Sequence, residues 1–240
     1  MENFKEVLAN EANKNSIVLN NEQLVKLEKY KNLLIEWNEK INLTAITDEY
    51  EIIMKHFIDS IEIVKYISAT ESIIDVGTGA GFPGVIIAIY FEDKAKVTLV
   101  DALEKRVKFL QDLKEKLELK NVEIVHARAE ELGKKEEYRE KYDVTTARAV
   151  SALNTLLEFN TPFIKVNGRG LFLKSNNLED EIKISNNALK VLNCKISNKY
   201  EYSYKVNNEL YNRYISEVLK TSSTPDKYPR NFGKIKKNPL

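Results

Sequence analysis

The chain has 240 residues, 43% of them hydrophobic, and a formal net charge of +1. This length suits one α/β domain with an added element, or at most two small domains. A single cysteine, Cys194, excludes an intrachain disulfide framework and a cysteine-rich zinc site, and two histidines disfavour a histidine-built metal site. The first twenty residues are polar and no apolar run approaches membrane length, so we expect a cytoplasmic protein without a membrane span.

The first 68 residues predict an all-helical cap. Helical spacing of apolar residues predicts a short amphipathic helix over Phe4–Lys14. Asn20 or Asn21 would cap a longer helix, whose apolar stripe consists of Leu24, Leu27, Leu34, Trp37 and Ile41. A third helix would begin at Asp48, with Glu51 three residues later, and run to about residue 67.

The stretch Ile73–Gly84 contains four of the eight glycines in the chain. Its first residues predict the end of a buried parallel strand, and the glycines predict a tight turn that lets a ligand approach the backbone. An apolar helix restarts at Val85–Ala88, and Pro83 is acceptable in its first turn. Strand, glycine turn and helix together indicate the nucleotide-binding end of a doubly wound sheet.

Two nucleotide classes compete for this turn. Gly79, Gly81 and Gly84 spell the dinucleotide pattern G-x-G-x-x-G. From Asp75 onward, however, D-x-G-x-G-x-G resembles the first motif of the S-adenosylmethionine-dependent methyltransferases. A carboxylate suits the cationic ammonium of that cofactor and would repel a pyrophosphate, so Asp75, Gly77 and Gly79 become predicted cofactor-binding residues.

From residue 72 onward, strands and helices alternate. Four further parallel strands are expected at Lys96–Asp101, Val122–His126, Tyr142–Ala147 and Arg169–Lys174, with helices over 103–119, 153–164 and 178–191. Two tyrosine-rich alternating segments predict a closing antiparallel hairpin, Lys195–Tyr204 and Tyr211–Leu219. The predicted fold is α/β, a class-I methyltransferase Rossmann-like sheet with helices on both faces. Its predicted parts are a cap (1–68), a methyltransferase domain (69–220) and a tail (221–240).

Several polar residues fall where such a sheet places its chemistry. Asp101 can accept both ribose hydroxyls of an adenosine, it can cap the helix that follows at Leu103, and the two roles are compatible. Ala129 and Glu130 follow the third strand, where an adenine would lie, although Glu130 could instead start a short helix. Arg148 follows the fourth strand and could pair with the methionine carboxylate or an RNA phosphate.

The remaining candidates are weaker. His56 stands three residues before Asp59 on one helix face and could act as a general base, although a lone helical histidine is more often structural. Asn42 and Lys174 are polar groups near the edges of the expected cleft. Methyltransferases that act on exocyclic amines of bases often carry an Asn/Asp-Pro-Pro-aromatic tetrapeptide after the fourth strand, whereas residues 143–150 contain no proline. Methylation at C5 of a pyrimidine needs a nucleophilic cysteine, and Cys194 lies in a late segment, far from the motif ends. These absences leave ring nitrogens, hydroxyls or carboxylates as methyl acceptors.

The last twenty residues carry five cations and one acid, a net charge of +4, which leaves −3 for the rest of the chain. A basic tail on a slightly acidic body is typical of a phosphate-contacting arm, and equally of an ordinary solvated terminus.

Seven segments resemble, in order, the bacterial 16S ribosomal RNA small-subunit methyltransferase G family, also called glucose-inhibited division protein B. They cover residues 37–45, 56–60, 75–84, 99–110, 126–132, 143–150 and 228–240. The resemblance extends over about residues 33–240. It departs from the family at Thr78, where serine is usual, and at Ser175, where glycine is usual.

The resemblance implies N7 methylation of a guanosine in 16S ribosomal RNA, with S-adenosylmethionine as cofactor. Carried over by position, the cofactor contacts would be Gly77, Phe82, Ala129, Glu130 and Arg148. The N7 atom has a free lone pair and loses no proton, so no general base is required, and neither a metal nor an oligomer is implied. Two rival functions stay open: an NAD-linked oxidoreductase, and an RNA-binding or ribosome-assembly factor without turnover.

Overall fold

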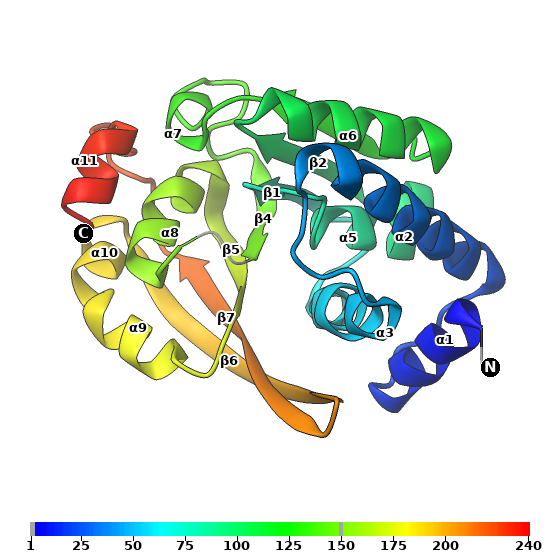
Figure 1. Cartoon of the computed structure of the whole chain (residues 1–240). Helices are drawn as coiled ribbons and strands as arrows, with labels where there is room; N and C mark the ends of the chain where they lie inside the picture. Colours follow the sequence, from blue (N-terminus) through cyan, green and yellow to red (C-terminus); the bar gives the residue numbers. More distant parts are fainter. Residues whose placement is uncertain (1–2, 149–150) are drawn as a thin grey trace.

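The computed structural model describes residues 3–148 and 151–240. Its centre is a seven-stranded sheet in the order β3-β2-β1-β4-β5-β7-β6 (Figure 1). The strands are β1 (Ser72–Val76), β2 (Lys96–Asp101), β3 (Val122–His126), β4 (Tyr142–Arg148), β5 (Ile164–Lys174), β6 (Cys194–Val206) and β7 (Glu209–Lys220). The first five are parallel, and β7 inserts antiparallel between β5 and β6. The expected parallel sheet with a closing antiparallel hairpin is therefore confirmed.

Helices cover both faces of the sheet (Figure 1). They are α1 (Phe4–Lys14), α2 (Asn21–Ile41), α3 (Glu49–Ile52), α4 (Asp59–Ile61), α5 (Gly84–Phe91), α6 (Glu104–Lys116), α7 (Ala129–Leu132), α8 (Leu153–Asn160), α9 (Leu178–Ile184), α10 (Asn186–Val191) and α11 (Phe232–Lys237). Short 3₁₀ turns lie at Glu62–Tyr66, Glu92–Lys94 and Thr161–Phe163, and a π-helical turn at Ile53–Ile58. None of the described helices is long and apolar enough to span a bilayer.

Neighbouring residues of β1 and β2 belong to hydrophobic clusters on opposite faces of the sheet. Ile73 and Leu99 pack with α1, α2, α5 and α6, whereas Ile74 and Val100 belong to a smaller cluster on the other face. This alternation follows from the two-residue period of a strand. The apolar side chains of the helical cap lie in the same cluster as the first sheet face, so residues 1–68 and the sheet share a core.

The cap begins as the sequence predicts and then departs from it. Asn20 caps α2 in a reciprocal capping box with Gln23, and the Asp48 side chain accepts the backbone N–H of Glu51 at 2.9 Å. The predicted third helix is not a continuous α-helix, because a π-helical turn at Ile53–Ile58 interrupts it. At this turn the carbonyl of Lys55 accepts a hydrogen bond from a distant arginine. Single π-helical turns inside helices are frequent at functional sites.

Other differences concern helix ends. The helix expected over 178–191 is divided at Ser185, whose hydroxyl donates to the carbonyl of Glu181. The helix expected over 153–164 ends at Asn160, because Pro162 lies in the 3₁₀ turn that follows. Among the other boundaries, α6 begins one residue later than expected and β5 begins five residues earlier. Arg148, which was expected to follow the fourth strand, is the last residue of β4.

The basic tail is anchored to the body. Arg139 donates hydrogen bonds to the carbonyls of Thr224 and Tyr228, and Arg230 forms an ion pair with Glu158, which is fully buried on α8. Arg230 is therefore a structural cation, which corrects its place in the predicted phosphate arm. The exposed lysines of α11 keep the positive charge of the tail at the surface.

Candidate active site

The site is built on a glycine loop at the carboxyl end of β1. Gly77, Gly79 and Gly81 have φ angles of 72°, 63° and 96°, in the left-handed region that favours glycine. Gly84 begins α5, and a β-carbon there would overlap the side chains of Leu99 and Asp75. The loop thus needs glycine for its backbone shape at three positions and for close packing at the fourth.

Asp75 lies beneath this loop and has no exposed surface. Its Oδ2 accepts hydrogen bonds from the Thr78 hydroxyl at 2.7 Å and the Gly84 N–H at 2.9 Å. Its Oδ1 is buried without a partner in the part of the chain that the structure describes. Burial raises the pKa of this carboxyl from its usual 3.8 to about 7. Thr78 supplies the same hydroxyl donor as serine, so its departure from the family pattern preserves this contact.

Asp101 ties the loop to the next helix. Its Oδ2 accepts the Gly79 N–H and its Oδ1 accepts the Leu103 N–H, both at 2.9 Å. The alternative role as helix cap is wrong, because α6 begins at Glu104 and Leu103 occupies the cap position without a side-chain bond. Asp101 instead binds the backbone two residues ahead, in an Asx turn.

A cavity of about 150 Å³ lies beside Asp101 and unites four predicted residues: Gly77, Asp101, Ala129 and Glu130. Glu130 is 6% exposed, and its carboxylate makes no hydrogen bond with any described residue. Glu130 lies in the first turn of α7, which confirms the expected short helix, whereas its contact with an adenine stays a prediction. Two further rings line the cavity, Phe159 and Phe232, and the sequence analysis missed both.

Phe82 is held among side chains of the cap. Its ring stacks on Tyr30 with centroids 5.0 Å apart and on His56 with centroids 4.9 Å apart, and the guanidinium of Arg148 lies 4.8 Å from its centroid. Tyr30 also donates from its hydroxyl to the carbonyl of Ala80 at 2.5 Å. The cap therefore contacts the glycine loop through Tyr30. The apolar stripe predicted for α2 did not include this residue.

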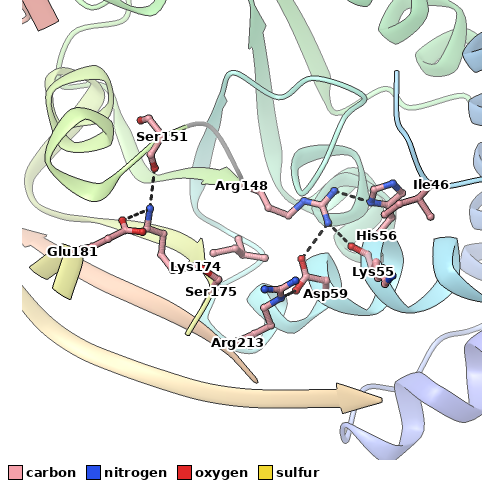
Figure 2. Close-up of a pocket in the computed structure, with 11 residues that line it drawn as sticks. Ile46, Lys55, His56, Asp59, Arg148, Ser151, Lys174, Ser175, Glu181 and Arg213 are labelled. Atoms are coloured by element: carbon pink, nitrogen blue, oxygen red, sulfur yellow. Dashed lines mark hydrogen bonds and ion pairs between the residues drawn. The ribbon is translucent and has the colours of Figure 1, made fainter. Parts of the chain in front are cut away.

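A second cavity, of about 490 Å³, opens beside Arg148 (Figure 2). Nη1 of Arg148 donates to the carbonyl of Lys55 at 2.8 Å and to Oδ2 of Asp59 at 3.1 Å. Nη2 lies 3.1 Å from Nδ1 of His56. Two distant predicted segments, residues 56–60 and 143–150, thus meet at one guanidinium. Ala149 and Val150, the end of the second segment, lie outside the described residues.

Both ring nitrogens of His56 are engaged. Because a guanidinium only donates, Nδ1 must accept from Arg148, and the protonated Nε2 then donates to the Thr44 hydroxyl at 2.8 Å. Burial and the charge of Arg148 lower the pKa of His56 from 6.5 to about 3. The imidazole is neutral at physiological pH and positions Arg148, which leaves it poorly suited to act as a general base.

Asp59 links this network to the hairpin. Its Oδ1 accepts the Tyr202 hydroxyl at 2.9 Å and lies 3.4 Å from Nε of Arg213 on β7. The two terminal nitrogens of Arg213 make no hydrogen bond with any described residue, and Arg213 lines the cavity. Sequence reasoning missed Arg213, because its place depends on the insertion of β7 next to β5.

Lys174 lies at the end of β5, on the cavity wall. Its Nζ donates to the carbonyl of Ser151 at 2.9 Å and pairs with Glu181 at 2.5 Å (Figure 2). Four cations and two carboxylates line this cavity, a formal charge of +2 that favours an anionic ligand: Lys55, Arg148, Lys174, Arg213, Asp59 and Glu181. Asn42 is exposed at the end of α2 and lines neither cavity.

Comparison with known proteins gives one family. The family model described as rRNA small subunit methyltransferase G matches residues 23–209. The protein named ribosomal RNA small subunit methyltransferase G from Acetivibrio thermocellus is 49% identical, covering 92% of this chain and 90% of that protein. The protein of the same name from Fusobacterium nucleatum is 48% identical, covering 91% and 92%.

Solved structures show the same fold. M. jannaschii TYW2 in complex with AdoMet matches with a TM-score of 0.55 and 16% identity, over 69% of this chain and 76% of that one. A SAM-dependent methyltransferase from Aquifex aeolicus matches with a TM-score of 0.53 and 18% identity, over 74% and 97%.

Proposed function

The chain belongs to the rRNA small subunit methyltransferase G family, and we propose that it methylates N7 of a guanosine in 16S ribosomal RNA with S-adenosylmethionine. One observation carries the proposal. A glycine loop with buried carboxylates and a cationic cavity lie at the same edge of the sheet, joined through Phe82 and Arg148. The first suits a cationic adenosine derivative and the second suits a nucleotide of RNA.

The residues present fit S-adenosylmethionine. Among the described residues, Oδ1 of Asp75 is buried without a hydrogen-bond partner, and the carboxylate of Glu130 makes no hydrogen bond. A β-carbon added at Gly79 would meet no atom nearer than 4.0 Å, so the loop leaves open space there. We assign cofactor binding to Asp75, Gly77, Gly79, Phe82, Asp101, Ala129, Glu130 and Arg148. The buried carboxyl of Asp75 beneath the loop disfavours the pyrophosphate of NAD.

When bound, S-adenosylmethionine supplies an electrophilic methyl group on a sulfonium. The chain itself needs only to orient and desolvate the reacting partners, because guanine N7 has a lone pair and no proton to lose. Arg148 donates to three acceptors and stacks over Phe82, so its side chain is held in place at the wall of the cationic cavity. Orientation of this kind can contribute about 7–11 kcal/mol to lowering a barrier.

We further propose that the small ribosomal subunit in the cytoplasm presents the RNA. The exposed lysines of α11 would contact its phosphates, and the cap would wall the cleft through Lys55 and His56.

We expect the double substitution Lys234→Ala/Lys237→Ala to weaken binding to 16S RNA at low salt. Each lost phosphate contact should flatten the dependence of log K on log salt by roughly 0.7–0.9, so the slope should fall by about 1.5. Lys29→Ala, on the exposed side of α2, is the matched control and should leave the slope unchanged. An unaltered slope in the double variant would refute the phosphate contact.

The reaction is tested by transfer of labelled methyl from S-adenosylmethionine to naked 16S RNA, 30S subunits and assembly intermediates, followed by nucleoside mapping. Labelled 7-methylguanosine supports the proposal. If the cofactor binds and no RNA state is methylated, the rival binding-only factor gains support. Binding of NAD in place of S-adenosylmethionine would favour the oxidoreductase.

Asp75 gives cofactor binding an expected pH dependence. A cationic ligand favours the ionised carboxyl, whose pKa is about 7 in the free protein, so binding below pH 7 must release a proton. Affinity for S-adenosylhomocysteine, which keeps the ammonium, should rise on the order of tenfold from pH 5.5 to 7.5. Calorimetry in buffers of different ionisation enthalpy measures the affinity and the released proton.

The same carboxyl affects stability. Its pKa is raised on folding, so the stability it contributes is present below pH 4 and is lost as pH rises toward 7. Asp75→Asn should abolish both the pH dependence of cofactor affinity and the pH dependence of stability. A cofactor affinity that varies with pH equally in wild type and Asp75→Asn would contradict the assignment, and His56, with a pKa of about 3, does not titrate in this range.

A further inference from the structure

The helix α11 places an aromatic ring at the cavity of about 150 Å³ beside Asp101. Phe232 lines this cavity and faces Phe159, with ring centroids 6.3 Å apart. The guanidinium of Arg128 lies 5.2 Å from the centroid of Phe232. Arg128 immediately precedes Ala129 and Glu130, which line the same cavity. The cavity is thus lined by residues from α8, from α11 and from the segment that follows β3.

The chain fixes α11 from both ends. Before the helix, the backbone N–H and the guanidinium of Arg230 bind the buried Glu158 at 2.6–3.1 Å. After it, the carbonyl of Asn238 accepts a bond from the same guanidinium. Ile235 is fully buried in between. A helix of six residues is not stable alone, so these tertiary contacts hold it in place.

Phe232 itself contributes little to this anchoring. It is 39% exposed, whereas Ile235 on the same helix is completely buried. A large apolar ring left partly in water forfeits hydrophobic stabilisation that a ligand in the cavity could restore. The position of Phe232 is therefore better explained by the cavity than by the core.

We propose that Phe232 forms the outer wall of the pocket for the adenine ring of the cofactor. This inference rests on the proposed function and adds a residue beyond position 209, where the match to the family model ends. A volume of about 150 Å³ is half of the roughly 300 Å³ at which whole-ligand sites begin, so the cavity suits one ring system.

The chemistry of the lining matches adenine. Val76, Val100 and Phe159 offer apolar surface to a base, and the open carboxylate of Glu130 can accept from an exocyclic amine. Phe232 adds a π face, on which a base can stack. The C-terminal segment thereby has two separate roles, a ring at the cofactor and lysines at the surface.

The test compares Phe232→Ala with Tyr50→Ala in binding calorimetry, using S-adenosylhomocysteine and adenosine as probes. Tyr50 is a matched control, because it is 38% exposed and lies on α3, outside both cavities. Phe232→Ala should weaken both probes by about tenfold, since the ring contacts only the base that they share. Tyr50→Ala should change neither affinity, and Phe232→Tyr should retain most of the wild-type affinity.

Unchanged affinity of Phe232→Ala for both probes would overturn the proposal, as would a loss confined to S-adenosylhomocysteine. Should Phe232→Ala unfold, Phe232→Leu decides, because it keeps apolar volume without the π face and should still bind more weakly than Phe232→Tyr. If wild-type protein binds neither probe, the proposed cofactor fails. If wild type binds and the Phe232 variants bind equally well, only this inference fails.

Discussion

Replacing Arg230 by alanine should lower the free energy of unfolding by about 3–5 kcal/mol, the usual cost of removing one partner of a buried ion pair. Glu158 has no exposed surface, and three donors of Arg230 reach its carboxylate: the backbone N–H and Nε at 2.8 Å and Nη2 at 2.6 Å. The hydrogen bond to Glu158 also raises the pKa of Arg230, so the guanidinium keeps its charge. Alanine would leave the carboxylate buried with only the backbone donor.

Denaturant unfolding measures this loss, with Lys234→Ala as control. Lys234 is exposed on the neighbouring helix, so its substitution should stay within about 0.5 kcal/mol of wild type. Arg230→Lys should be intermediate, since it keeps the charge without the paired geometry. Arg230→Ala/Glu158→Leu should recover most of the lost stability, because no buried charge remains. Equal stability of Arg230→Ala and Lys234→Ala would refute the buried-pair account.

Local pattern was sufficient for the elements whose residues are bounded by clear signals. The strands β2 and β3 begin and end at the predicted residues, because each is a short apolar run between polar or turn-forming neighbours. The glycine loop was identified because unusual backbone angles require unusual residues. Asn20 and Asp48 mark helix starts because their side chains bind nearby backbone.

Long-range contacts account for what the sequence did not reveal. The π-helical turn coincides with the carbonyl of Lys55 binding Arg148, a residue 93 positions away. Arg213 reaches the second cavity because β7 lies between β5 and β6, and Phe232 reaches the first because Arg230 docks on α8. Polar residues that directly follow a predicted strand could be identified from the sequence. Arg213 and Phe232 could not, because distant parts of the fold bring them to the cavities.

The second large effect is expected at the glycine loop. Replacing glycine by alanine at two positions separates the role of the loop in packing from its role in ligand binding. Gly84 begins a helix with an ordinary φ, where alanine would be favoured by propensity. A β-carbon there would nevertheless overlap Leu99 and lie 2.8 Å from Oδ2 of Asp75, which binds the Gly84 N–H. Gly84→Ala should therefore cost about 3 kcal/mol of unfolding free energy, from overpacking and a disturbed buried carboxyl.

Gly79→Ala should affect ligand binding more than packing. Its φ of 63° costs alanine about 1–2 kcal/mol, yet its β-carbon would enter open space above the loop. If that space receives the cofactor, Gly79→Ala should remain folded and lose at least roughly tenfold in affinity for S-adenosylhomocysteine. Denaturant unfolding and calorimetry on both variants check the pair. A Gly79→Ala protein with wild-type affinity would mean that the cofactor does not approach the loop at this residue, whereas a stable Gly84→Ala protein would mean that α5 can shift away from Asp75.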